Sequence, residues 1–158
     1  MEIWGEYDDE NDYVSNEWDI FIEKYIKQNY PDIYKIRKID LDKYYDLIDE
    51  TIKQDKIKIA KALSTLINNK KMQLDYSIRD SQLILGLIIR MAREGKFSSI
   101  LIKRKLPTKL FSGFPFRLKS VGLTIISKLL LDKYHFKIWK HPNERIKALK
   151  KEALLLKL

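Results

Sequence analysis

The chain has 158 residues, 45% of them hydrophobic, and is long enough to form one globular domain around its own core. Its lack of cysteine excludes a disulfide framework, a thiolate zinc site, an iron–sulfur cluster and a cysteine nucleophile. The 31 Lys and Arg residues outnumber the 22 Asp and Glu residues, and the resulting formal charge of +9 favours polyanionic partners.

Acidic residues are concentrated at the N-terminus. Residues 1–19 contain eight acids and no base, which leaves 31 bases against 14 acids in the rest of the chain. The sequence begins with acids rather than with a signal peptide, and no apolar stretch is long enough to span a bilayer, so we expect a soluble, cytoplasmic protein with no membrane partner. We expect residues 1–14 to form an acidic leader, mobile or docked on a basic surface, and residues 15–158 to form a helical domain.

The first predicted helix is capped by Ser15 or Asn16 and ends at Asn29, ahead of Pro31. Its apolar positions follow a helical repeat: Trp18, Phe21, Ile22, Tyr25 and Ile26. Two further helices are predicted after caps at Asp40 and Asp55. The apolar side of the second consists of Leu41, Tyr44, Tyr45, Ile48 and Ile52, and that of the third consists of Ile59, Leu63, Leu66 and Ile67.

A fourth helix is expected from Ser77 or Asp80 to Glu94, where Gly95 would supply the left-handed residue that often ends a helix. Its apolar stripe contains Leu83, Ile84, Leu87, Ile88 and Met91. A short fifth helix is expected over residues 98–105, before Pro107. It precedes the most basic and phenylalanine-rich part of the chain.

The sixth helix is predicted from near Pro115 to about Tyr134, and the seventh from residues 142–144 to the C-terminus. The seventh has an apolar stripe of Ile146, Leu149, Ala153 and Leu156. The best strand candidate is residues 135–139, where polar and apolar side chains alternate along part of the segment. The sequence therefore predicts an all-α fold, a single compact bundle of about six to seven helices with a short acidic leader. The residues expected to be most clearly buried are Trp18, Phe21, Ile84, Leu87, Ile88, Ile126, Leu129 and Leu130.

Residue types suited to catalysis are scarce. The two histidines, His135 and His141, lie near a helix boundary and are expected to be ordinary surface or packed residues. No zinc, calcium-loop or phosphate-loop spacing occurs, so we expect no metal, no cofactor and no enzymatic activity. The acidic run at residues 8–12 could hold a hard cation or mimic nucleic acid, although such runs are usually solvated.

The basic residues nearest to Pro107 are the predicted nucleic-acid contacts. They are Lys103, Arg104, Lys105, Lys109, Arg117 and Lys119. Phe111 and Phe116 lie among them and either stack on bases or belong to the core, whereas Phe114 is expected in the core. Because lysine predominates, backbone contact with RNA or single-stranded DNA is favoured over base reading, and affinity should fall on the order of a hundredfold between about 50 and 200 mM salt.

The segment from Phe114 to Lys133 resembles the small-subunit family of type III, Cmr-type CRISPR effector complexes. The features that carry the resemblance are Pro115, the Gly122–Leu123 pair seven residues later, and the apolar helix through Leu130. Val121 departs from the polar residue usual in that family, and the leader is an addition. The resemblance implies a non-catalytic subunit of a ribonucleoprotein complex that supports the guide–target duplex through basic contacts.

Two alternatives remain open at this stage. The run at residues 39–45, followed by a long helix ending in basic residues, looks like the helical domain of a GINS-type replication accessory subunit, although the usual small β-domain is not evident. An archaeal or viral DNA-binding protein is the other alternative. No helix-turn-helix pattern supports it.

Overall fold

The computed structural model describes residues 12–69, 78–95, 97, 114–132 and 139–157. These residues form α1 (Asp12–Asn29), α2 (Pro31–Ile36), α3 (Leu41–Gln54), α4 (Lys56–Asn69), α5 (Ile78–Glu94), α7 (Phe116–Leu131) and α8 (Pro142–Lys157). No strand occurs in this part of the chain, and the helices pack as a compact bundle, which confirms the predicted all-α class. The helix expected over residues 98–105 and most of the strand candidate lie outside the described residues.

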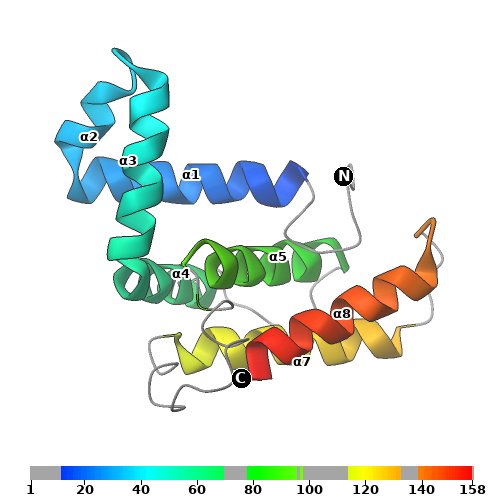
Figure 1. Ribbon diagram of the computed structural model, residues 1–158. Coiled ribbons are helices and arrows are strands. Elements are labelled where there is room, and N and C mark those ends of the chain that lie inside the picture. Colours follow the sequence, from blue (N-terminus) through cyan, green and yellow to red (C-terminus); the bar gives the residue numbers. More distant parts are fainter. Residues whose placement is uncertain (1–11, 70–77, 96, 98–113, 133–138, 158) are drawn as a thin grey trace, which may run out of the picture.

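Helix α5 occupies the centre of the bundle (Figure 1). It packs against α1, α3, α4 and α7, and every residue from 81 to 89 is buried. The sequence predicted a one-sided stripe here, but Leu85 and Ile89 on the other sides are also fully buried. A helix that is apolar around its whole circumference is suited to a position enclosed by other helices.

The N-terminal helices differ from the prediction in three places. Helix α1 begins at Asp12 rather than after Ser15, so residues 12–14 of the expected leader are helical and Val14 is buried. Pro31 ends α1 and also opens α2, a short helix that the sequence analysis missed. Asp40 caps α3 as predicted, since its Oδ1 accepts a hydrogen bond from the backbone N–H of Lys43 at 3.1 Å.

The buried faces follow the predicted stripes with a few exceptions. Trp18, Ile84, Leu87, Ile88, Ile126 and Leu129 are buried as expected, whereas Phe21 and Leu130 are only partly buried against the same core. On α3, Leu41 and Tyr45 are 50% and 53% exposed, so only Tyr44, Ile48 and Ile52 of its predicted apolar stripe are buried in the core.

Gly95 follows α5 directly, but its backbone is not left-handed as predicted. A Cβ at this position would lie 2.7 Å from Cε2 of Phe97, and the Phe97 ring packs on Phe114 with centroids 5.0 Å apart. The glycine therefore provides room for an aromatic ring rather than a special backbone conformation. Phe114 is half-buried against the core, in agreement with the prediction for this residue.

The carboxylate of Asp55 is a contact point among the N-terminal helices. Asp55 lies between α3 and α4 and is buried, and its Oδ2 accepts hydrogen bonds from the hydroxyl groups of Tyr25 at 3.0 Å and Tyr30 at 2.5 Å. Burial and the hydrogen bond to Asp55 raise the pKa of Tyr25 to about 12. The Asp55 carboxylate therefore holds the end of α1 and the start of α2 at the corner between α3 and α4.

This contact predicts a pH dependence. Folding raises the pKa of Tyr25, so the protonated tyrosine stabilises the folded protein. This stabilisation is complete below the unfolded pKa of about 10 and is lost as the pH rises toward about 12. In Asp55→Asn the tyrosine should ionise at lower pH than in the parent protein, though above about 10 because burial remains. NMR of isotope-labelled tyrosine measures the midpoint, with Tyr25→Phe assigning the signal. An unchanged midpoint in Asp55→Asn would contradict the assigned role of the carboxylate.

Helices α7 and α8 form an antiparallel pair below α5 (Figure 1). Pro115 immediately precedes α7, which ends at Leu131, earlier than the predicted Tyr134. Gly122 is closely packed against both neighbouring helices, because a Cβ there would lie 2.5 Å from Leu156 of α8 and 3.4 Å from Ile88 of α5. The expectation that Gly122 admits a neighbouring helix is confirmed.

Candidate nucleic-acid interface

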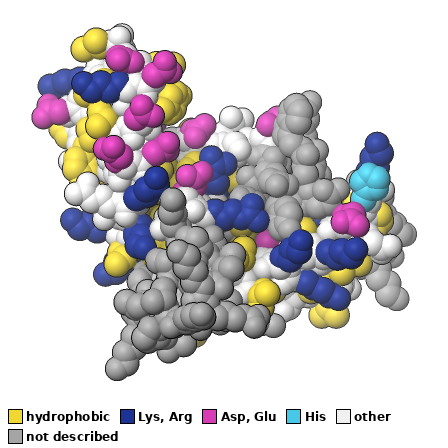
Figure 2. Space-filling view, viewed as in Figure 1, with side chains coloured by type: hydrophobic (Ala, Val, Ile, Leu, Met, Phe, Trp, Pro, Cys, Tyr) yellow, Lys and Arg dark blue, Asp and Glu magenta, His cyan; other side chains and the backbone are white. Residues whose placement is uncertain are grey.

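The exposed side of α8 carries a row of lysines. Lys147, Lys150 and Lys151 are all exposed, and their i, i+3, i+4 spacing places them on one helical face. The opposite side is held in the core by Ala148, Leu149 and Leu156. In Figure 2, Lys and Arg side chains gather along the α8 side of the molecule. We call Lys147, Lys150 and Lys151 the α8 lysine face.

Little acidic charge opposes this face. Lys147 Nζ lies 3.6 Å from Glu144, but both side chains are at least 60% exposed, and an ion pair of this kind contributes little. Lys150 and Lys151 form no ion pair with any described carboxylate. The ammonium groups are therefore available to an anionic partner.

Two ionisable residues on the inner side fix the orientation of α8. Arg145 and Glu152 are both fully buried, although residues of these types are seldom buried completely. The guanidinium of Arg145 lies 4.5 Å from the ring centroid of Trp139, a distance typical of a cation–π contact. Rotating α8 to turn its lysines inward would expose the apolar residues and break the Arg145 contact.

The start of α7 adds a cation and an aromatic ring near the end of α8. Arg117 is exposed, Lys119 is half-exposed, and the Phe116 ring is 79% exposed. Gly122 contacts Leu156, so the first turns of α7 lie beside the last turns of α8. Of the predicted nucleic-acid contacts, Arg117 and Lys119 thus belong to the basic half of the fold. Lys103, Arg104, Lys105 and Lys109 lie outside the described residues, as does Phe111.

Charge is distributed unevenly between the two ends of the bundle. Residues 12–55 contain eleven acids against seven bases, whereas residues 114–132 and 139–157 together contain nine bases against three acids. Figure 2 shows Asp and Glu side chains gathered over α2 and α3, at the end of the molecule away from α8. A polyanion is therefore attracted to the α7–α8 pair and repelled by the α2–α3 end.

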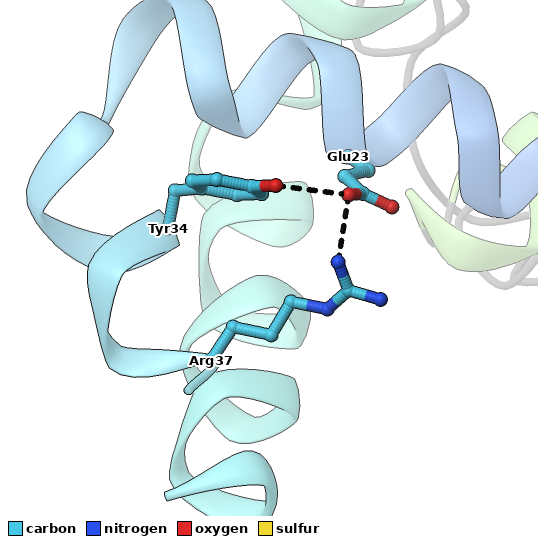
Figure 3. A network of polar contacts seen from close by, with 3 residues as sticks. All are labelled: Glu23, Tyr34 and Arg37. Carbon is cyan, nitrogen blue, oxygen red and sulfur yellow. Dashed lines mark hydrogen bonds and ion pairs between the residues drawn. The ribbon is translucent and has the colours of Figure 1, made fainter. Parts of the chain in front are cut away.

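A second concave region lies between α1, α3 and α5 and has a volume of about 380 Å³. Its rim includes Glu23 and Arg37, and Figure 3 shows that Glu23 Oε1 accepts from Arg37 Nη1 at 2.9 Å and from the nearby Tyr34 hydroxyl at 3.3 Å. The Glu23 carboxylate raises the pKa of Arg37. Across the rim, Arg90 Nε lies 2.9 Å from Glu94 Oε1. We call this region the α1–α3 cleft.

No set of three or more His, Asp and Glu side chains among the described residues is arranged to hold a metal ion. His141 is exposed next to the start of α8, and His135 and Trp4 fall outside the described residues. None of the described helices has both the length and the apolar character needed to cross a membrane. The acidic run at residues 8–12, which could hold a cation but for which no metal was predicted, falls almost entirely outside the described part of the chain.

The α8 lysine face was not among the predicted contacts. The sequence does contain a signal for this face. Once the apolar stripe of α8 is assigned to the core, the lysines fall on the opposite face of the helix. The prediction instead favoured residues adjacent in the sequence. Comparison of the chain with protein-family models, with curated proteins and with solved structures finds no match.

Proposed function

We propose that this protein is a non-catalytic, helical subunit that binds the nucleic-acid backbone through its basic C-terminal half. The α8 lysine face carries this proposal, because three exposed ammonium groups share one face of a helix whose other face is in the core. Lysine is a flexible point charge that suits phosphate contacts and lacks the rigid planar fork of arginine, which favours geometrically specific contacts with bases. Binding is therefore independent of base sequence.

Single-stranded nucleic acid fits this surface better than a duplex does. The exposed Phe116 ring next to Arg117 can stack on an unpaired base, and stacking of this kind is insensitive to base identity. Stacked bases inside a duplex do not offer a free face to such a ring. We therefore propose RNA or single-stranded DNA as the ligand.

The setting that we propose is a ribonucleoprotein complex, in which the chain acts as a small subunit of a type III CRISPR effector. The family pattern on which this rests includes Pro115 at the start of α7 and Gly122 at the contact with α8. A GINS-type replication subunit is the second candidate, and the exposed apolar residues at the start of α3 favour some protein partner in either case. Co-purification with RNA-binding subunits supports the first proposal, and co-purification with a helicase supports the second.

The expected salt dependence follows from counting phosphate contacts. Lys147, Lys150, Lys151 and Arg117 supply four, and each contributes about −0.7 to the slope of log K against log salt for a single strand. Affinity for single-stranded RNA should then fall by about fiftyfold between about 50 and 200 mM salt, and further if other cations contribute. Fluorescence anisotropy with labelled homopolymers of different bases measures both the slope and the sequence independence.

Homopolymers whose bases differ in how strongly they stack on aromatic rings provide the internal control. Their slopes should agree because the phosphate contacts are the same, and their absolute affinities should differ only modestly because an aromatic ring such as Phe116 can stack on any base. A salt-independent affinity, or no binding at low salt, would contradict the proposed function.

A further inference from the structure

The α1–α3 cleft has an apolar, partly aromatic floor. Trp18 and Ile22 of α1 and Tyr44 and Ile48 of α3 line it, and each is less than 10% exposed. The ring of Tyr45 stands at the mouth, 53% exposed and with its centroid 5.6 Å from that of Tyr44. The volume of about 380 Å³ lies in the range of small-molecule sites. The floor can therefore accept the hydrocarbon part of a ligand.

The rim carries more negative than positive charge. Four carboxylates and two guanidinium groups line the cleft, and the guanidinium groups of Arg37 and Arg90 are already paired with Glu23 and Glu94. Asp19 and Asp49 are the remaining two carboxylates, and neither forms an ion pair within the described structure. Two negative charges at the cleft are thus left without a partner cation.

The environment of Asp19 is consistent with an excess of negative charge at the cleft. Partial burial raises the pKa of Asp19, and the nearby Arg90 charge opposes the rise without cancelling it. The guanidinium carbon of Arg90 also lies 6.0 Å from the Trp18 ring centroid, so a planar cation already rests against the aromatic floor. Asp19 is otherwise exposed to solvent, so a ligand can reach its carboxylate, and a further positive charge there would offset the partial desolvation.

We propose that the α1–α3 cleft binds an alkylguanidinium or alkylammonium group, with its charge between Asp19 and Asp49 and its hydrocarbon chain on the Trp18 and Tyr44 floor. This site is separate from the α8 lysine face and has the opposite charge preference. The cation is supplied either by a free small molecule or by an arginine or lysine side chain of a partner protein. Both sources present the same chemistry to the cleft.

Isothermal titration calorimetry with N-butylguanidinium at physiological ionic strength tests the proposal. The neutral isostere N-butylurea is the matched probe, and it should bind at least about tenfold more weakly because it cannot satisfy the carboxylates. N-acetylarginine N-methylamide separates the two sources. If it binds as well as N-butylguanidinium, a partner's side chain is the ligand, and if it binds much more weakly, the ligand is a free small cation.

Variants locate the site. Combining Asp19→Asn with Asp49→Asn should lower the affinity for N-butylguanidinium by about tenfold or more. Combining Asp46→Asn with Glu50→Gln removes the same charge from exposed positions of α3 that do not line the cleft, and should change the affinity less than about twofold. Equal binding of the cation and the urea by the parent protein, no saturable binding of either cationic probe, or an unchanged affinity in the Asp19 and Asp49 variant would overturn the proposal.

Discussion

Replacing Lys147, Lys150 and Lys151 together by alanine is expected to lower the affinity for single-stranded RNA by about a hundredfold at about 0.1 M salt. Each lysine that contacts a phosphate contributes about a fivefold factor at this salt concentration, through the release of a condensed counterion. The slope of log K against log salt should fall by about 2 at the same time. Alanine is a strong helix former and the three side chains are exposed, so α8 should remain folded.

The matched control removes three lysines from the other end of the molecule. Lys43, Lys53 and Lys58 are exposed on α3 and α4, and replacing them by alanine changes the net charge equally. The control should lose less than about fivefold in affinity, because charges beyond a Debye length are largely screened. Equal losses in the two variants would mean that net charge, rather than the α8 lysine face, determines binding.

The substitution Ile88→Ala is expected to destabilise the fold by about 2 to 5 kcal/mol. Ile88 is fully buried on the central helix and lies beside Gly122, where α5 packs against α7. With three helices around the site, the structure can collapse only partly into the space that the side chain leaves. A domain of this kind has a total stability of about 5 to 15 kcal/mol, so a large fraction would be lost.

Denaturant unfolding followed by circular dichroism measures the loss. Ile57→Ala removes the same atoms from α4, but Ile57 is 44% exposed, and the expected change is within about 0.5 kcal/mol of zero. If Ile88→Ala were as mild as this control, the packing of α5 against α7 would not be the main source of stability.

The helices could be predicted from the sequence wherever a one-sided apolar stripe was long. The stripe ending in Ile26 gives the end of α1, the stripe ending in Ile67 places α4 correctly, and the cap at Asp40 gives the start of α3. The early start of α1 could not be predicted because Val14 is a single apolar residue among acids, and its burial depends on packing with distant segments. Helix α2 was missed because Pro31 signals both the end of one helix and the start of another.

The candidate sites could be predicted less well than the fold. A charged surface is a property of a helix face, and the lysines of α8 are separated in sequence by the residues that anchor the helix. The α1–α3 cleft is assembled from three helices, with Asp19 and Asp49 thirty positions apart in the chain. No local pattern connects them, because the packing of α1 and α3 against α5 brings them to one rim.

The uneven distribution of charge gives the described part of the molecule a large electric dipole, directed along the line from α3 to α8. In the field of a polyanion this dipole experiences a torque, so the protein rotates before contact and arrives with α8 foremost. Fewer encounters are then wasted on unproductive orientations, and association is faster than random collision allows. If nucleic acid binds as proposed, the same torque turns the α2–α3 end outward and leaves the α1–α3 cleft accessible.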